Sequence, residues 1–286
     1  MSDPSGPTVR RRRLGSELRR LREQAGLDQL AAARDLECSN SKISRIELGQ
    51  GLPKMIELRS LLDLYGVTDE DERAKILEIR KEASEIGWWE QAEYETVLPS
   101  GLGVYVGLEY DARSVRAWEL GYVPGLLQTE SYARAVLGSS GLKTADEVGR
   151  LARVRIQRQQ RLTAKSNPVE LVAVVDEAAL LRPVGGRAVM RDQLAHLLST
   201  AEMPNVTLQI HPLDSSAHAG MLGAFTLLNF GDSEPVVGYV ESPAGNNFLE
   251  RDRQTRMLVH TFDRLRAGAL DPGDSAALLA ELAAKE

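Results

Sequence analysis

The sequence of 286 residues contains one cysteine and four histidines, and it has no long uninterrupted hydrophobic run. A single thiol, Cys38, excludes an internal disulfide. The histidines are His196, His211, His218 and His260. No two of them have the spacing of metal ligands on one helix, so we expect satisfied or surface histidines and no metal site. Without a run suited to a signal peptide or a membrane span, the sequence predicts a cytoplasmic protein that does not enter a membrane.

Catalytic motifs are also missing. The sequence has no G-x-S-x-G nucleophile motif, and its one glycine pair before a predicted helix, Gly185-Gly186, is more typical of a turn than of a phosphate loop. Asp176 and Glu177 are adjacent at the end of a predicted strand, so their carboxylates should diverge rather than act on one substrate. We therefore expect no catalytic residue, no cofactor and no enzymatic activity.

The charge is unevenly distributed along the chain. The net charge is −6, but the first 60 residues contain 12 Lys and Arg against 8 Asp and Glu, a net of +4, which leaves −10 for the other 226. This length suggests about two domains. We predict a flexible basic arm at 1–11, a DNA-binding domain at 12–86, a linker at 87–103 and a second domain at 104–286. The run from Arg10 to Arg13 allows two interpretations: an arm that reaches phosphate or the minor groove, or a solubilising tail.

Residues 27–47 have the pattern of two helices joined by a tight turn. In the second helix Ile43 and Ile46 should face the core, and a polar stripe should face outward. Asn and Arg side chains can read adenine and guanine edges in the major groove, and short serines let the backbone approach. The stripe consists of Asn40, Ser41, Ser44 and Arg45.

The flanks of the two helices predict phosphate contacts. Asp28 can cap the first helix, which places Gln29 at its N-terminus with a side chain and backbone amides able to hold a phosphate. Ser39 can cap the second helix, and Lys42 provides a point charge for the DNA backbone. The predicted DNA-contacting residues are Gln29, Ser39, Asn40, Ser41, Lys42, Ser44 and Arg45. The alternative is a structural helical hairpin with a solvated face.

Three more helices complete an all-α unit of five. Leucines at helical spacing predict a helix at 12–25 before this pair and a fourth helix from Met55 to Tyr65 after it. Thr68 followed by Asp71 resembles a capping box for a fifth helix running to about Ile86. Residues 29–47 resemble the helix-turn-helix of Xre/Cro-type regulators, with Gln29 and the I-S-R-I-E run ending at Glu47. This resemblance implies a double-stranded DNA operator.

Two positions depart from the family pattern. Glu37 stands where the turn usually has glycine, and Ala32 stands where leucine is usual. We expect a somewhat strained turn and a lighter core at these positions. Two half-sites read together would require a homodimer.

The second domain is predicted to be α+β with a small, mainly antiparallel sheet. The expected helices are 112–120, 130–137, 145–164, 187–201, 251–266 and 274–284, and the expected strands are 170–175, 206–210, 224–230 and 236–241. The last three strands have the spacing of an antiparallel meander. The helix at 145–164 should be basic on one side.

The segment W-E-L-G-Y-V-P-G-L-L-Q-T-E-S-Y-A-R, residues 118–134, resembles the C-terminal domain of WhiJ-like Xre regulators of high-GC Gram-positive bacteria. Further matching segments are 155–159, 176–178, 182–186, 225, 239–241 and 265–277. The resemblance implies an antitoxin-like transcription regulator with a small partner protein encoded nearby.

A binding role is thus predicted for the second domain, for either a small effector or a partner protein. The apolar, turn-forming segment could form a groove wall or a core turn that orders two helices. We favour the partner protein because of the resemblance. The predicted partner-binding residues are Val123, Pro124, Leu126, Leu127, Gln128 and Thr129.

Overall fold

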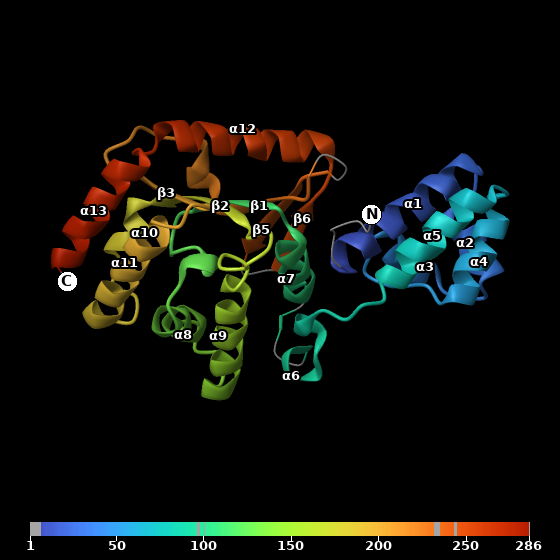
Figure 1. Cartoon of the computed structure of the whole chain (residues 1–286), viewed down its shortest axis with the longest axis horizontal. Helices are drawn as coiled ribbons and strands as arrows, with labels where there is room; N and C mark the ends of the chain where they lie inside the picture. The colour runs from blue at the N-terminus through green and yellow to red at the C-terminus, as the bar shows by residue number, and fades with distance from the viewer. Residues whose placement is uncertain (1–6, 96–97, 100, 232–234, 243–244, 286) are drawn as a thin grey trace. The chain divides into compact units, whose positions relative to one another are not determined.

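The computed structural model describes residues 7–95, 98–99, 101–231, 235–242 and 245–285. The chain divides into two compact units, Met1–Gln91 and Ala92–Glu286. The helices of the first unit are α1 Pro7–Gln24, α2 Gln29–Asp35, α3 Asn40–Glu47, α4 Met55–Leu64, α5 Glu70–Glu82 and the short η1 Trp88–Glu90 (Figure 1). The division falls within the range 87–103 that the sequence suggested as a linker, but part of that range is helical.

Side-chain caps and glycines set the helix limits in the first unit. Asp28 caps α2 by accepting from the amide of Ala31, and Ser39 caps α3 by accepting from that of Lys42. These two predictions are confirmed. Glycines with positive φ follow α1 and α4. The helices enclose one core, whose fully buried members include Leu14, Leu18, Ile43, Leu58, Leu61 and Leu62.

Two predictions for the first unit need correction. Helix α1 begins at Pro7 rather than at residue 12, so residues 7–11 of the expected arm are helical. Arg10 pairs with Glu82 at the end of α5 (Nε–Oε2 3.3 Å), and Arg11 pairs with Glu90 in η1. Residues 1–6 lie outside the described part of the chain. Helix α5 is capped by Asp69 and not by Thr68.

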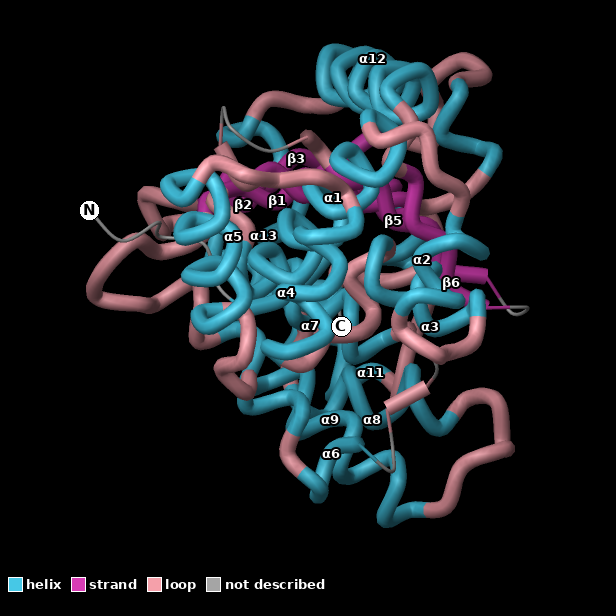
Figure 2. Tube along the Cα trace, turned by 90° about the vertical axis from the view of Figure 1, so that its right-hand side faces the viewer, coloured by secondary structure: helices cyan, strands magenta, loops and turns pink. Residues whose placement is uncertain are grey.

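In the second unit the described residues form a six-stranded mixed sheet in the order β3-β2-β1-β4-β5-β6. Strands β1, β2 and β3 are parallel, and β4, β5 and β6 continue antiparallel. The strands are β1 Ser114–Glu119, β2 Glu170–Asp176, β3 Val206–His211, β4 Phe225–Asn229, β5 Val237–Ser242 and β6 Gly245–Leu249. In Figure 2 the strands, in magenta, form one band, and α12 lies above this band.

Helices cover both faces of the sheet. The helical elements are α6 Ala92–Glu95, α7 Leu102–Asp111, η2 Gly125–Leu127, α8 Glu130–Gly138, α9 Ala145–Gln159, α10 Glu177–Leu181, α11 Arg187–Ala201, η3 Ala219–Leu222, α12 Asp252–Gly268 and α13 Pro272–Lys285. Helix α12 lies on one face, and α7, α8, α9 and α11 lie on the other (Figure 1). Trp118 and Phe262 are in the core under α12. Alternation along β1 puts Ala117 and Glu119 on the opposite face.

The predicted small antiparallel sheet was wrong in three respects. Residues 112–120 were predicted as a helix, but Ser114–Glu119 form the central strand β1, in which partly exposed polar residues alternate with buried ones as far as Ala117. Strand β3 pairs in parallel with β2 instead of starting a meander, because α10 and α11 form the crossover between them. The polar edge strand β6 was not predicted.

Candidate functional sites

The first candidate site is the outer face of α3. Ser39, Asn40, Ser41 and Arg45 are exposed, and Ser44 is partly exposed. Ile43 and Ile46 point into the core with 1% and 3% of their surface exposed. The helix therefore presents its polar stripe to solvent as expected for a base-reading surface. Glu37 in the preceding turn has φ +47°, a left-handed conformation that favours glycine, which fits the expected strain.

Gln29 has a structural partner. Its amide Nε2 donates to Oε2 of Glu47 (2.8 Å), and Glu47 also forms a two-point ion pair with Arg22 (2.6 and 3.0 Å). Glu47 and the Arg22 side chain are buried, so this pair joins α1 to the end of α3. Gln29 thus stands at the N-terminus of α2 with one N–H of its side-chain amide bound to Glu47, which leaves the second N–H as the possible donor to a phosphate.

Lys42 is also paired. Its Nζ lies 2.6 Å from Oε1 of Glu57, whose Oε2 accepts from the backbone amide of Lys54 at the start of α4 (2.9 Å). Partial burial alone would raise the pKa of the Glu57 carboxyl, but the hydrogen bonds of Lys42 and Lys54 outweigh burial and lower it. Lys42 is therefore neutralised in the free protein, and contact with a phosphate requires it to leave Glu57.

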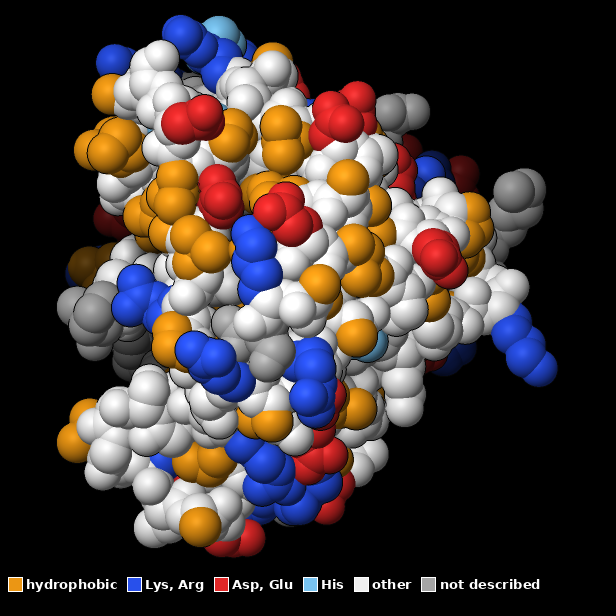
Figure 3. Space-filling view, turned by 90° about the vertical axis from the view of Figure 1, so that its left-hand side faces the viewer, with side chains coloured by type: hydrophobic (Ala, Val, Ile, Leu, Met, Phe, Trp, Pro, Cys, Tyr) orange, Lys and Arg blue, Asp and Glu red, His pale blue; other side chains and the backbone are white. Residues whose placement is uncertain are grey.

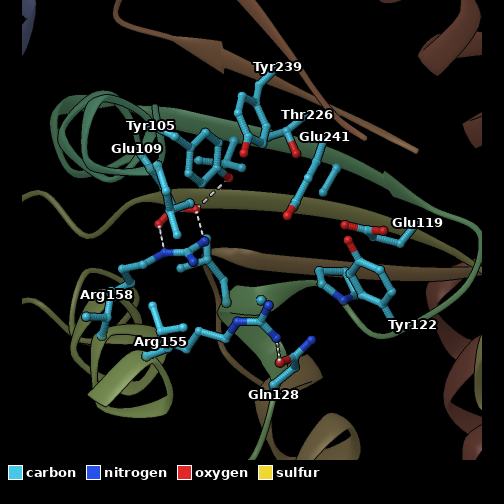
Figure 4. Close-up of a pocket in the computed structure, with 18 of the residues that line it drawn as sticks. Tyr105, Glu109, Glu119, Tyr122, Gln128, Arg155, Arg158, Thr226, Tyr239 and Glu241 are labelled. Atoms are coloured by element: carbon cyan, nitrogen blue, oxygen red, sulfur yellow. Dashed lines mark hydrogen bonds and ion pairs between the residues drawn. The ribbon is translucent and has the colours of Figure 1, made fainter. Parts of the chain in front are cut away.

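The second candidate site is a polar cavity in the second unit, on the sheet face opposite α12. Its volume is about 140 Å³. Its polar lining comes from α7, β1, the loop before η2, α9, β4 and β5 (Figure 4). The labelled residues are Tyr105, Glu109, Glu119, Tyr122, Gln128, Arg155, Arg158, Thr226, Tyr239 and Glu241. Apolar residues and Lys143 complete the lining.

Arg158 and Glu109, which both line this cavity, form an ion pair with each other. Arg158 donates to both oxygens of Glu109 (2.6 and 2.7 Å), and the hydroxyl of Tyr105 donates to Glu109 Oε2 (2.8 Å). Burial alone would lower the pKa of the Arg158 guanidinium, but Glu109 outweighs burial and raises it. The pair forms a fixed wall with a full set of charge-assisted hydrogen bonds.

Arg155, one helical turn before Arg158 on α9, has no such partner. Its Nη1 donates to the neutral amide oxygen of Gln128 (2.6 Å), and no carboxylate among the described residues lies within ion-pair distance. Burial, and then the charge of Arg158, lowers the pKa of Arg155. The guanidinium of Arg155 therefore has only a neutral hydrogen-bond partner, and Glu241 and Glu119 act on its charge from beyond ion-pair distance.

Glu119 and Tyr239 supply unpaired groups opposite the arginines. Oε2 of Glu119 and the hydroxyl of Tyr239 are buried without a hydrogen-bond partner. Burial, and then the charge of Glu241, raises the pKa of Glu119 to about 8. Glu119 is thus mostly protonated at neutral pH and can donate a hydrogen bond. Such unpaired polar groups in a cavity are what a bound ligand would satisfy.

The segment predicted to bind a partner protein forms part of this cavity and the core. Val123, Pro124, Leu126, Leu127 and Gln128 are buried, and only Thr129 is partly exposed. These side chains are not accessible to a docking protein in this fold, so binding there would require the segment to move, and the predicted partner contacts stay a prediction.

Hydrogen bonds hold that segment in place. Gln128 Nε2 donates to the carbonyl of Val123 (2.6 Å), and Gln193 Nε2 donates to that of Leu127 (2.7 Å). Thr129 caps α8 by accepting from the amide of Tyr132. The segment therefore has both of the roles that the sequence left open: it forms a turn in the core and it forms part of the cavity wall.

The histidines are less scattered than their sequence positions suggested. His211 and His218 lie together with Asp176, and the three side chains are spaced so that they could hold a metal ion. Glu177 points elsewhere, since its Oε2 accepts from the amide of Leu213 (2.9 Å). His196 instead contacts Thr200 on its own helix.

The chain thus combines a helix-turn-helix, whose second helix exposes a polar face, with a unit that contains a polar cavity. This combination places it in the class of DNA-binding regulators. A family model described as a helix-turn-helix domain matches residues 13–76. The chain belongs to the family described as a domain of unknown function, DUF5753, whose model matches residues 102–281. No curated protein and no solved structure gives a significant match. No helix among the described residues is long and apolar enough to cross a membrane.

Most of the cavity was not predicted from the sequence. The helix at 145–164 was predicted to be basic on one side, but two of its arginines, Arg155 and Arg158, line the cavity. Their spacing of three residues on a helix, beside the buried Leu151 and Val154 of the same helix, was the available signal. Glu119 and Tyr239 lie in segments that resemble the WhiJ-like regulators, but neither segment indicates a cavity, because only the sheet and α7 bring these two residues together with Glu109.

Proposed function

We propose that the protein is a sequence-specific transcription regulator and that a small anionic effector bound in the cavity of the second unit changes its affinity for DNA. The observation that carries this proposal is the guanidinium of Arg155, which faces the cavity with only the neutral Gln128 as partner. A carboxylate or phosphate could accept from it in two places at once. Lys143 at the cavity supports the same choice of charge.

The cavity also limits the size and polarity of the effector. A volume of about 140 Å³ resembles that of an engineered cavity that holds benzene, which suggests about six to ten non-hydrogen atoms in the enclosed part of the ligand. Protonated Glu119 and the hydroxyl of Tyr239 suit a hydroxyl or carbonyl at the end opposite the anionic group. The effector class is therefore a small hydroxy or oxo acid, or its phosphate counterpart.

On the DNA side, we propose that Asn40 and Arg45 read bases and that Ser39, Ser41 and Ser44 let the helix approach the groove. A homodimer would place two copies of α3 on two half-sites. The resemblance to WhiJ-like regulators supports this DNA-binding role.

The same resemblance implied a small partner protein, but the segment assigned to that partner is buried. On the face shown in Figure 3, charged side chains interrupt the hydrophobic ones. The described residues of this face therefore form no continuous apolar patch of the kind that a partner protein would cover.

The DNA-binding part is tested by footprinting on the promoter of the gene itself, followed by affinity measurements with variants. Arg45→Ala should weaken operator binding by about 5- to 150-fold, the equivalent of ~1–3 kcal/mol, without unfolding the domain. Arg19→Ala is the matched control, because Arg19 is an exposed arginine that pairs with Glu23 on α1. Equal operator affinity of the two variants would remove Arg45 from the interface.

The effector part is tested by thermal-shift screening with small carboxylates and phosphates, followed by operator binding in the presence of each ligand that stabilises the protein. Arg155→Gln should abolish both effects. Arg153→Gln changes an exposed arginine on the same helix and should keep them. If the ligands act equally on both variants, or if operator affinity responds only to a small protein encoded beside the gene, the effector proposal is wrong.

A further inference from the structure

We propose that Asp176, His211 and His218 form a binding site for a divalent transition-metal ion such as Zn²⁺. Their ligand atoms all lie within 4.8 Å of one another. Ligands with bonds of ~2.0–2.1 Å to one tetrahedral zinc lie about 3.3 Å apart, so small side-chain rotations would close the site. The site is separate from the polar cavity, and the proposal does not depend on the proposed effector.

The fold itself brings the first two ligands together. Asp176 and His211 are register partners at the ends of the parallel strands β2 and β3. Paired residues on neighbouring strands point to the same face, and the carboxyl ends of parallel strands are where α/β proteins commonly place ligands. Asp176 Oδ1 accepts from the amide of Ala178 (2.9 Å), which orients the carboxylate and leaves Oδ2 for a metal.

The third ligand is held against the sheet by a neighbouring tryptophan. His218 directly precedes η3, and Trp118 Nε1 on β1 donates to the carbonyl of Gly220 in η3 (2.9 Å). A Cβ atom on Gly220 would lie 2.7 Å from both Trp118 and Leu265, so only glycine allows this close approach. The indole also meets both imidazoles edge-on, with ring centroids 5.7 Å from His211 and 5.5 Å from His218. The loop is therefore positioned by contacts that need no metal.

Two features of the imidazoles suit metal binding. Nδ1 of His218 is buried and has no hydrogen-bond partner, an arrangement that a bound ion would explain. Nδ1 of His211 contacts Oγ of Ser215 (3.2 Å), the kind of outer contact that orients a metal-binding imidazole. The site borders a groove of about 670 Å³ between the η3 region and α12, which would let water or another ligand complete the coordination.

The donor set selects the kind of metal. Two imidazoles and one carboxylate suit zinc, cobalt, nickel or ferrous iron, whereas magnesium and calcium prefer oxygen ligands alone. Three protein ligands leave at least one position open. A bound ion would also tie the loop of His218 to the ends of β2 and β3, so it should stabilise the folded second unit.

The test is titration of the full-length, metal-free protein without an affinity tag, using Zn²⁺ in calorimetry and Co²⁺ in absorption spectroscopy. We expect one equivalent of either ion to bind and Mg²⁺ not to bind. Co²⁺ should give the visible bands of a site of low coordination number and should quench Trp118, since both proposed imidazole ligands contact its ring.

Variants identify the ligands. His218→Ala and Asp176→Asn should each weaken Zn²⁺ binding at least tenfold, and the asparagine keeps an oxygen to accept from Ala178. His196→Ala is the matched control, because it removes a histidine outside the site. Circular dichroism checks that each variant is folded. No saturable binding by the unaltered protein, or equal affinity of the control and the two site variants, would overturn the proposal.

Discussion

Lys42 and Glu57 show how one residue can regulate the charge of a DNA-binding surface. Their ion pair joins α3 to the start of α4 and masks the cation that we propose contacts the phosphate backbone. Glu57→Gln would release Lys42, while an amide oxygen could still accept from the backbone of Lys54. We expect tighter non-specific DNA binding and a salt dependence steeper by about one unit, because one more phosphate is neutralised.

The measurement is DNA affinity at a series of salt concentrations. The double variant Glu57→Gln, Lys42→Ala is the control and should lose the gain. An unchanged salt dependence in the single variant would show that Lys42 contacts DNA even while Glu57 is present, or that it stays away from DNA altogether.

Glu119 predicts a pH dependence of stability in the second unit. Its pKa in the folded protein is raised to about 8 from 4.5, chiefly by burial. Between these pH values the unfolded chain has lost the proton and the folded protein has kept it. The stabilisation from protonated Glu119 is therefore complete below about pH 4.5, falls by roughly 1.4 kcal/mol per pH unit above it, and is gone past about pH 8.

Glu119→Gln should remove this dependence, since the amide stays neutral. Urea unfolding between pH 5 and pH 8 should show that the variant gains stability relative to the original protein as the pH rises. Glu170→Gln, at the exposed start of β2, is the control. A constant difference between Glu119→Gln and the original protein across this range would contradict the raised pKa.

At the scale of single elements, the packing of α1 on α3 depends on Gly15. A Cβ atom there would lie 2.5 Å from the carbonyl oxygen of Ile46 and 2.7 Å from that of Glu47. Gly15→Ala should therefore push the end of the recognition helix away and cost ~1–3 kcal/mol of stability. Gly51→Ala is the matched control, because its Cβ would find no atom closer than 3.8 Å. Similar unfolding midpoints for the two variants would contradict the close approach.

The elements that the sequence predicted well are those with local signals. The limits of α2, α3, α8 and α11 could be predicted because a side-chain cap or a glycine pair marks where each begins. Strand β1 could not, because it has only six residues and is fixed by pairing with β2 and β4, which lie more than 50 residues further along the chain. The cavity could not be predicted for a similar reason. Gln128 lies in a recognisable segment, but its hydrogen bond with Arg155 joins residues 27 positions apart and depends on how α9 packs.

At the scale of the whole molecule, the two units should divide DNA binding from regulation. The fragment for testing this must extend to Gln91, because Trp89 is only 3% exposed and Glu90 pairs with Arg11. We expect fragment 1–91 to keep salt-sensitive DNA binding, since it contains the helix-turn-helix and its local positive charge: residues 1–60 have a net charge of +4, and the −5 of residues 61–91 lies mainly on α5 and the segment after it.

The same fragment should bind the operator more weakly than the full chain and should not respond to the effector. The first difference follows because a monomer contacts one half-site, whereas a dimer formed through the second unit contacts two. The second follows because an effector can shift DNA affinity only through the unit that binds it, by a coupling of typically ~1–3 kcal/mol. Footprinting and sedimentation of both proteins measure these effects. Equal operator affinity would assign dimerisation to the first unit or exclude it, and an effector response by the fragment would place the regulatory site outside the cavity.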